Sequence, residues 1–360
     1  MGRRSKFIFL SILIGLLAMM IILLGTALGI FPKFGSGMPA SESAKRYPYQ
    51  QLSGREKQLY TALYKGIEDY EETIRLPGIY TQAEYTRVYL MLAEQEPQFF
   101  YLDTVYETGD AMADVTMFYA VEKEDIALMK AQMDLVADRI LKQAESARSD
   151  MLKLLAIHDG IAAVCEYSNG TYQDEAYGCL VDGKAKCEGY AKAFLYVARR
   201  GGLNVMNVTG TINGGENHVW NIAEIDGTFY HIDLTWDDDP EYRGSVAHNC
   251  FAVPDAQFGD HHPDLTAYQP PVCAGEAHGY YSLEQLVVTD ASTFPEMVRT
   301  WPWDASLMEF QYANEQVYAD IQKLIQSSSE VRAAVKQVSG AASYRAIADE
   351  TRGALLILPS

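Results

Sequence analysis

Hydrophobic residues in the first part of the chain follow helical and strand-like spacings in turn. Ser53 and Glu56 form a capping-box pattern, and the apolar residues after them recur every three or four positions, which predicts a helix. Aromatic and β-branched runs at 99–106 and 115–121 are separated by a Gly-Asp pair, which predicts a β-hairpin. Apolar residues then recur at helical spacing over 126–165. This part is therefore expected to be mainly helical, with one hairpin.

The middle of the chain predicts one helix followed by antiparallel strands. Residues 187–200 carry apolar side chains on one side, and two glycines follow, as is typical of a helix end. Strand-like runs come next at 203–208, 218–225 and 228–237. The last two are joined by Asp226-Gly227, a strong signal for a two-residue hairpin. We expect the helix to pack on an antiparallel sheet.

Beyond Tyr280 the pattern changes and predicts a small α+β unit. Because the order of helices and strands restarts there, this unit is expected to be separable from the rest. The predicted elements are a strand at 307–312, a helix at 315–325, a shorter helix, and strands at 344–348 and 354–358.

A long apolar run lies near the N-terminus. Residues 7–31 carry no charged side chain, and at about 1.5 Å per residue a helix of this length crosses a hydrocarbon core of roughly 30 Å. Three basic residues precede the run, which favours a cytoplasmic N-terminus and an extracytoplasmic body. A cleaved signal peptide is the alternative, but its apolar region is usually shorter. We expect a single-pass protein of the cell membrane, anchored by this helix.

These patterns divide the chain into segments. A chain of 360 residues exceeds the common size of one domain, so appended pieces are expected. The expected segments are a signal anchor at 1–34, a flexible linker at 35–49, a helical region with a hairpin at 50–150, a catalytic core at 151–275 and a small α+β unit at 280–360.

Composition and charge narrow the classes of function. Apolar residues make up 48% of the chain and charged residues 21%, so the body is expected to fold. The formal net charge is -19, and the acidic residues are scattered rather than gathered in a tail. Because such a surface repels a polyanion, we expect no nucleic-acid partner.

One of the five cysteines has the position of a nucleophile. Cys187 falls in the first turn of a predicted helix, where the helix dipole and unpaired backbone N–H groups favour a thiolate. The same N–H groups can hold the oxyanion formed when the thiolate attacks an acyl carbon. A buried structural cysteine is the alternative. The five form an odd set in a disulfide-permissive compartment, so at least one should be unpaired.

The predicted hairpin register brings a histidine and an aspartate together. If Asp226-Gly227 forms the turn, Trp220 faces Asp233, and Asp233 is a diagonal neighbour of His218 on the same sheet face. The carboxylate can then orient the imidazole, whose other nitrogen accepts the thiol proton of Cys187. We therefore predict that Cys187, His218 and Asp233 are catalytic. The alternative is a hydrogen-bonded structural pair.

Several other residues are candidates for the catalytic base or for the lining of the substrate cleft. His231 lies on the predicted face of His218 and is the second candidate for the base, whereas Trp236 is placed on the opposite, core face. No paired cysteine spacing typical of zinc is present, and we expect neither a metal nor another cofactor. The candidates for lining the substrate cleft are Trp220, His231, Tyr190 and Trp236. The histidines without comparable context are His158, His248, His261, His262 and His278.

Three ordered motifs carry a family resemblance. They are Gly183-Lys-Ala-Lys-Cys-Glu-Gly-Tyr-Ala-Lys-Ala-Phe194, Asn217-His-Val-Trp-Asn221 and Asp226-Gly-Thr-Phe-Tyr-His-Ile-Asp-Leu-Thr-Trp-Asp237. Over about residues 152–254 the chain resembles the transglutaminase-like superfamily. The resemblance implies an α+β class with a papain-like core, in which Cys187 is the nucleophile, His218 the base and Asp233 the residue that orients it.

The motif around the nucleophile departs from one branch of that family. Animal transglutaminases usually have Gln and Trp beside the nucleophile, whereas this chain has Lys186 and Glu188. We expect a thiol-dependent acyl-transfer enzyme that cleaves or exchanges peptide or side-chain amide bonds of a peptide or protein substrate at the cell surface. The alternatives are a non-catalytic module that binds peptide or glycan in the same cleft, and an envelope scaffold.

Overall fold

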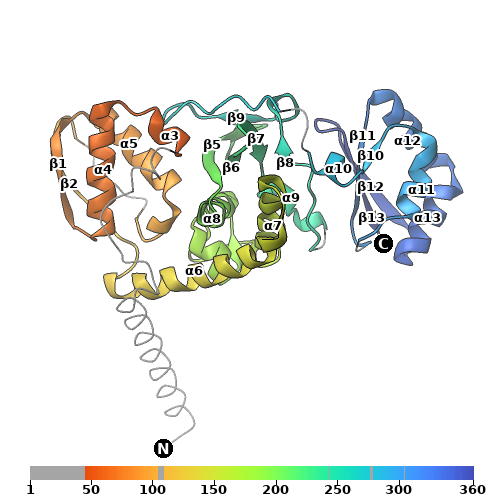
Figure 1. Ribbon diagram of the computed structural model, residues 1–360, viewed down its shortest axis with the longest axis horizontal. Coiled ribbons are helices and arrows are strands. Elements are labelled where there is room, and N and C mark those ends of the chain that lie inside the picture. Colours follow the sequence, from red (N-terminus) through yellow and green to blue (C-terminus); the bar gives the residue numbers. More distant parts are fainter. Residues whose placement is uncertain (1–44, 104–108, 243, 276–278, 304) are drawn as a thin grey trace, which may run out of the picture.

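The computed structural model describes residues 45–360 except 104–108, 243, 276–278 and 304 (Figure 1). An N-terminal region, a core with a central sheet and a C-terminal unit follow one another along the long axis. The predicted anchor at residues 7–31 lies outside the described residues. Among the residues that are described, no helix combines the length and the apolar character needed to cross a membrane.

The N-terminal region combines helices with a two-stranded sheet. The predicted helix after Ser53 is confirmed: the Ser53 hydroxyl accepts the Glu56 N–H (3.3 Å), and the Glu56 carboxylate accepts the Ser53 N–H (2.8 Å). The elements are α3 (Tyr47–Gln50), α4 (Gly54–Glu68), β1 (Thr73–Tyr80), α5 (Gln82–Gln95), the 3-10 helix η1 (Pro97–Phe99) and β2 (Met112–Thr116).

The hairpin predicted in this region is formed only in part. β2 pairs with β1, which precedes it by a whole helix, and not with the described residues 99–103. Within the described residues, the two predicted runs meet only at an isolated bridge between Leu102 and Tyr119. The side chains of residues 99–101 are buried in the hydrophobic core instead. Aromatic residues suit both a strand and a core, so the composition of this run did not decide between them.

The helical stretch predicted over 126–165 forms two helices, α6 and α7. The Ser149 hydroxyl accepts the Leu152 N–H (3.3 Å), which marks the start of the second helix. The elements up to the sheet are α6 (Lys123–Gln143), η2 (Ala144–Ser146), α7 (Asp150–Ala162), β3 (Glu166–Tyr167), the π-helix η3 (Gly178–Asp182), β4 (Lys184–Ala185) and α8 (Cys187–Arg200).

An antiparallel sheet with the strand order β8-β7-β6-β5-β9 forms the centre of the core. The predicted hairpin register is confirmed, since Asn221 lies opposite Ile232. Asp226 and Gly227 have φ values of 52° and 79°, as a tight hairpin turn with two positive φ angles requires. The elements are β5 (Asn204–Ile212), β6 (Glu216–Ile225), β7 (Thr228–Ile232), α9 (Leu234–Asp237), η4 (Pro240–Tyr242), β8 (Phe251–Val253), η5 (Asp255–Gln257) and β9 (His261–Pro263).

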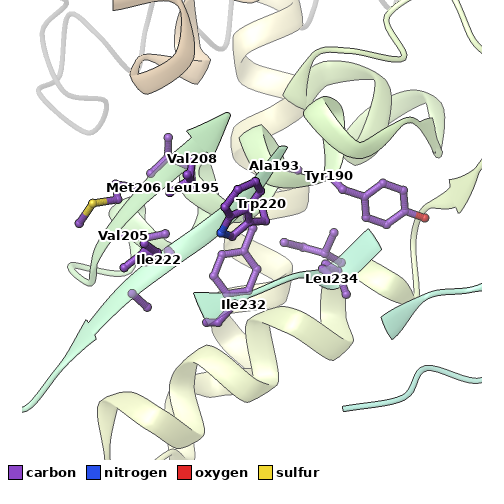
Figure 2. Packing of buried hydrophobic residues seen from close by; sticks show 14 of the residues in the cluster. Tyr190, Ala193, Leu195, Val205, Met206, Val208, Trp220, Ile222, Ile232 and Leu234 are labelled. Atoms are coloured by element: carbon purple, nitrogen blue, oxygen red, sulfur yellow. The ribbon is translucent and has the colours of Figure 1, made fainter. Parts of the chain in front are cut away.

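The cysteine helix α8 packs on β5 and β6, as predicted for this α+β core. The Asn221 side-chain amide donates to the Ala191 carbonyl of α8 (3.1 Å), so the sheet face that carries Asn221 lies against the helix. Figure 2 shows the buried side chains between these layers, Leu195 among them. Burying one such side chain contributes about 1.5–3 kcal/mol to the stability of the fold. The packing of several of them therefore fixes the position of α8 relative to the sheet.

Strand β7 ends at Ile232 rather than at the predicted residue 237. The Asp233 carboxylate accepts the N–H groups of Thr235 (3.1 Å) and Trp236 (3.3 Å) and thereby caps α9. In consequence Trp236 does not lie on the core face of the sheet. Its ring lies beside that of His218, with 6.0 Å between the centroids.

The C-terminal unit has the α+β organisation that the sequence predicts. Its strands form a sheet with the order β10-β11-β13-β12, and helices cover it (Figure 1). The elements are α10 (Tyr280–Leu283), β10 (Val287–Val288), η6 (Ala291–Thr293), α11 (Phe294–Arg299), β11 (Met308–Tyr312), α12 (Glu315–Ser327), α13 (Ser329–Ser339), β12 (Tyr344–Asp349) and β13 (Ala354–Pro359).

Buried polar contacts join the C-terminal unit to the core. Glu309 on β11 lies 2.6 Å from His248 Nδ1, and Arg352 in the β12–β13 turn lies 2.9 Å from Asp260. Removing one partner of a buried pair leaves an uncompensated charge, at a cost of about 3–5 kcal/mol. These contacts argue against the expectation that residues 280–360 separate cleanly from the core.

Replacing Gly189 by alanine should destabilise the protein by about 1–3 kcal/mol, because the new Cβ collides with the Gln173 carbonyl oxygen beside the start of α8. Thermal unfolding followed by circular dichroism measures the change. Gly54→Ala is the matched control, since a Cβ at the start of α4 meets nothing within 4 Å. A Gly189→Ala protein as stable as the wild type would contradict the close packing of α8.

Candidate active site

Cys187 is the first residue of α8. Its side chain is half-buried, whereas the other cysteines, Cys165, Cys179, Cys250 and Cys273, are buried. The N-cap residue Lys186 makes no side-chain cap, so within the described chain the first-turn N–H groups are not claimed by a capping side chain. These N–H groups and the positive end of the helix dipole favour a thiolate and, later, an oxyanion.

Strand β6 brings His218 to the start of α8. His218 Nε2 lies 2.6 Å from Asp233 Oδ2, and the Cys187 thiol is a further hydrogen-bond partner of the ring. Burial lowers the pKa of His218, but the charge and hydrogen bond of Asp233, followed by the contact with Cys187, raise this pKa to about 10. An imidazolium beside the thiol is therefore stable near neutral pH.

Asp233 lies between the end of β7 and the start of α9 and is 1% exposed. One carboxylate oxygen accepts the two backbone N–H groups of α9, and the other lies within hydrogen-bond distance of His218 and of His261. Burial raises the pKa of Asp233, but the two histidines hold it well below its usual range. The carboxylate is therefore ionised and fixed in orientation.

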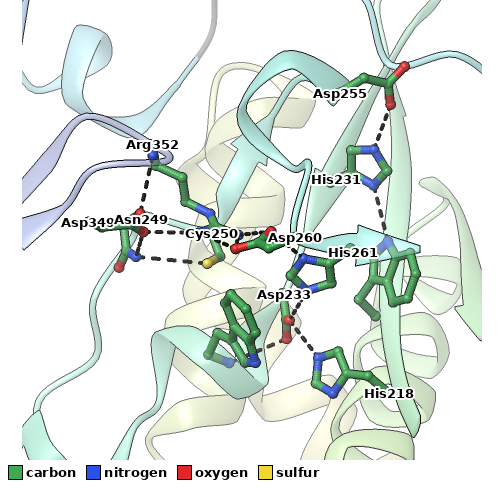
Figure 3. A network of polar contacts seen from close by, with 12 residues as sticks. His218, His231, Asp233, Asn249, Cys250, Asp255, Asp260, His261, Asp349 and Arg352 are labelled. Atoms are coloured by element: carbon green, nitrogen blue, oxygen red, sulfur yellow. Dashed lines mark hydrogen bonds and ion pairs between the residues drawn. The ribbon is translucent and has the colours of Figure 1, made fainter. Parts of the chain in front are cut away.

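His261 was not expected at the site. Its Nε2 lies 3.0 Å from Asp233 Oδ2, and its Nδ1 lies 2.8 Å from Asp260 Oδ1 (Figure 3). The contact arises because β9 pairs with β5, the neighbour of β6, and the His261 ring lies 5.5 Å from the His218 ring between centroids. The local pattern around this histidine contains no signal of that distant pairing.

Two of the candidates for the cleft are core residues. Tyr190 is fully buried, and its hydroxyl donates to Asp238 (2.5 Å). Trp220 is 1% exposed and lies against Phe258 and His261. Aromatic side chains with a satisfied polar tip are suited to such interior positions. Trp236, which is half-buried beside His218, keeps a place at the edge of the site.

His231 lies outside the contacts of Cys187 and His218. Its Nδ1 accepts the indole N–H of Trp220 (3.1 Å), and its Nε2 lies 2.8 Å from Asp255 Oδ1. Burial lowers the pKa of His231, so the ring is neutral and donates to Asp255 through Nε2. Both nitrogens are engaged away from the thiol, which disfavours His231 as the base and as a cleft residue.

Several groups of side chains have the donor atoms of a metal site. In each group the atoms lie within 4.8 Å of one another, yet the ring nitrogens are already hydrogen-bonded to carboxylates. The expectation of a site without a metal stays a prediction. The groups are His218, Asp233 and His261; His158, Asp159 and His248; and His231, Asp255 and Cys273.

Comparison with known families gives one match. Residues 136–234 match the family model described as the transglutaminase-like superfamily, and Cys187, His218 and Asp233 all lie within this range. His261 and Arg352 lie beyond it. No curated protein matches the chain.

Distant similarity to solved structures is also found. A crystal structure of a TGase is 16% identical, covers 40% of this chain and 47% of its own, and has a TM-score of 0.29. A protein from Cytophaga hutchinsonii assigned as a cysteine protease is 16% identical, covers 44% of this chain and 58% of its own, and has a TM-score of 0.28. The matched region thus spans about half of each of these chains. Similarity at this level is too distant to transfer an activity.

Asp233→Asn should lower the reactivity of Cys187 at neutral pH. Burial lowers the pKa of His218, and in the variant no carboxylate charge offsets this effect. The pKa therefore falls, and the ring becomes neutral. The rate of Cys187 alkylation by iodoacetamide at about pH 7 should then drop roughly tenfold for each pKa unit lost below the working pH. Alkylation rates across about pH 5 to 9 measure the effect, and identical profiles for both proteins would contradict it.

Proposed function

We propose that this protein is a thiol-dependent acyl-transfer enzyme acting on peptide or side-chain amide bonds, because residues 136–234 match the family model of the transglutaminase-like superfamily. One observation carries the proposal. Cys187 at the start of α8, His218 on β6 and Asp233 at the end of β7 form a continuous hydrogen-bonded series. Cys187 is the nucleophile, His218 the acid and base, and Asp233 the residue that orients the ring.

The first half of the proposed reaction forms a thioester. In the resting pair the proton is already on His218; the Cys187 thiolate attacks the amide carbon, and the C–N bond breaks as His218 gives its proton to the leaving amine. The tetrahedral oxyanion is stabilised by the first-turn N–H groups of α8. In the second half, water or a primary amine attacks the thioester carbon, His218 accepts its proton, and the thiol is released.

The residues beside the nucleophile favour water as the acceptor over protein cross-linking. Lys186 and Glu188 stand where animal transglutaminases, which this chain resembles only in part, have Gln and Trp. Lys186 lies over the Tyr167 ring (4.3 Å), and Glu188 pairs with Lys192 (2.9 Å). The two chain neighbours of the nucleophile are therefore charged rather than amide or aromatic, and we infer hydrolysis as the main outcome.

The substrate is proposed to be a peptide or protein at the cell surface. The apolar run at residues 7–31 and the basic residues before it support an anchored body outside the cytoplasm. Burial raises the pKa of Cys179, Cys250 and Cys273, and Cys165 is buried as well, whereas Cys187 is half-buried and open to a substrate. A binding module with the same fold has no need for an activated thiol.

Incubation of the full-length protein with a peptide mixture and a primary amine tests the proposal. Mass spectrometry should show cleaved peptides or deamidated side chains, with a smaller yield of amine-exchanged products. Cys187→Ala should abolish every product, because no thioester can form. Amine-exchanged products in excess would instead indicate transamidation.

His218→Gln and His231→Gln form a matched pair for the same assay. Both replace a buried histidine that pairs with an aspartate, but only His218 contacts Cys187. We expect His218→Gln to lose turnover by about three to four orders of magnitude and His231→Gln to keep it. A wild-type thiol that reacts with iodoacetamide no faster than free cysteine would favour the binding module.

A further inference from the structure

The turn between β12 and β13 reaches from the C-terminal unit into the core. Arg352 in this turn is 2% exposed and forms a two-pronged contact with Asp260: Nη2 lies 2.9 Å from Oδ1, and Nη1 lies 3.1 Å from Oδ2. The guanidinium also lies over the rings of Trp236 (5.1 Å) and Phe258 (5.2 Å). Arg352 is therefore held by a carboxylate on one side and by aromatic rings on another.

The contact continues from Asp260 to the proposed catalytic residues. Asp260 Oδ1 lies 2.8 Å from His261 Nδ1, and His261 Nε2 lies 3.0 Å from Asp233 Oδ2 (Figure 3). Both ring nitrogens of His261 face carboxylate oxygens. His261 therefore bridges two buried acids, Asp260 through Nδ1 and Asp233 through Nε2.

Packing holds this bridge in place. The His261 ring stacks on Phe258 with 3.7 Å between the centroids and meets Trp220 edge-on at 5.0 Å. The Asp233 oxygen that accepts from His261 is the same atom that lies 2.6 Å from His218. A change in the direction of the His261 N–H therefore turns the carboxylate that orients His218.

We propose that Arg352, Asp260 and His261 are positioning residues for the Cys187–His218–Asp233 series, so that the C-terminal unit completes the active site. The inference rests on the proposed function. It assigns to the C-terminal unit a role that the family match cannot supply, since the matched range ends at residue 234.

The test uses the full-length protein and needs no substrate. Two variants are compared with the wild type. In His261→Gln a single side-chain amide group replaces the two ring nitrogens. In Arg352→Met the side chain keeps about the same length but loses its charge. The rate of Cys187 alkylation by iodoacetamide at neutral pH should fall roughly 10- to 100-fold in both, the range seen when a partner of an active-site ligand is removed. Arg352→Lys should recover part of the rate, since it keeps the charge without the two-pronged geometry.

Glu309→Gln separates positioning from stability. It disturbs another buried contact between the C-terminal unit and the core, at His248, without touching Asp233 or Asp260. We expect a lower melting temperature and an unchanged alkylation rate, whereas Arg352→Met lowers both.

The outcomes distinguish this inference from the proposed function. Wild-type alkylation no faster than that of free cysteine would overturn the proposed function, and the positioning role with it. An activated wild-type thiol, with His261→Gln and Arg352→Met reacting at the wild-type rate, would overturn the positioning role alone. Equal loss of rate in Glu309→Gln and Arg352→Met would also overturn it, because loss of stability would then account for both.

Discussion

The buried charge of Asp233 is the constraint on which the rest of the structure depends. A carboxylate taken out of water without partners costs several kcal/mol, so its position must be surrounded by donors. Here they come from His218 on β6, from His261 on β9 and from two backbone N–H groups of α9. The three segments are separate elements of the fold, and all must be in place before the charge is stable.

Solvation of this one group explains several features that otherwise look unrelated. β7 ends at Ile232 because the next residue, Asp233, caps α9. Its carboxylate accepts backbone N–H groups of that helix, and the chain leaves the sheet there. β9 is a short strand at the edge of the sheet, yet it has a role because it delivers His261. The C-terminal unit joins the same polar system through Arg352. The orientation of the His218 imidazole therefore depends on the packing of the whole core.

Features encoded by short stretches of sequence could be predicted. The capping box at Ser53 and Glu56 and the Asp226-Gly227 turn are local, and each fixes its element with little help from elsewhere. The register of β6 and β7 follows from that turn, which is why the neighbourhood of His218 and Asp233 was predictable. The N-cap role of Asp233 was also visible in principle, because aspartate before an apolar turn favours that position.

Features that depend on long-range pairing could not be predicted. The partner of β2 is β1 rather than the nearer aromatic residues 99–103, and only the folded core shows that the side chains of 99–101 are buried. His261 lacks any local pattern, and Arg352 comes from another part of the chain. Tyr190 and Trp220 have the composition of cleft residues, but the layers on either side enclose them. In each case tertiary packing outweighed local preference.

The late position of Arg352 in the chain has a consequence for biosynthesis. A ribosome produces Cys187, His218 and Asp233 well before it reaches the β12–β13 turn, so the nascent chain holds its nucleophile before it holds the last positioning contact. A reactive thiolate is most hazardous while the chain is still unfolded beside other unfolded chains. In the mechanism proposed above, order of synthesis delays full reactivity until the C-terminal unit has been made and has folded against the core.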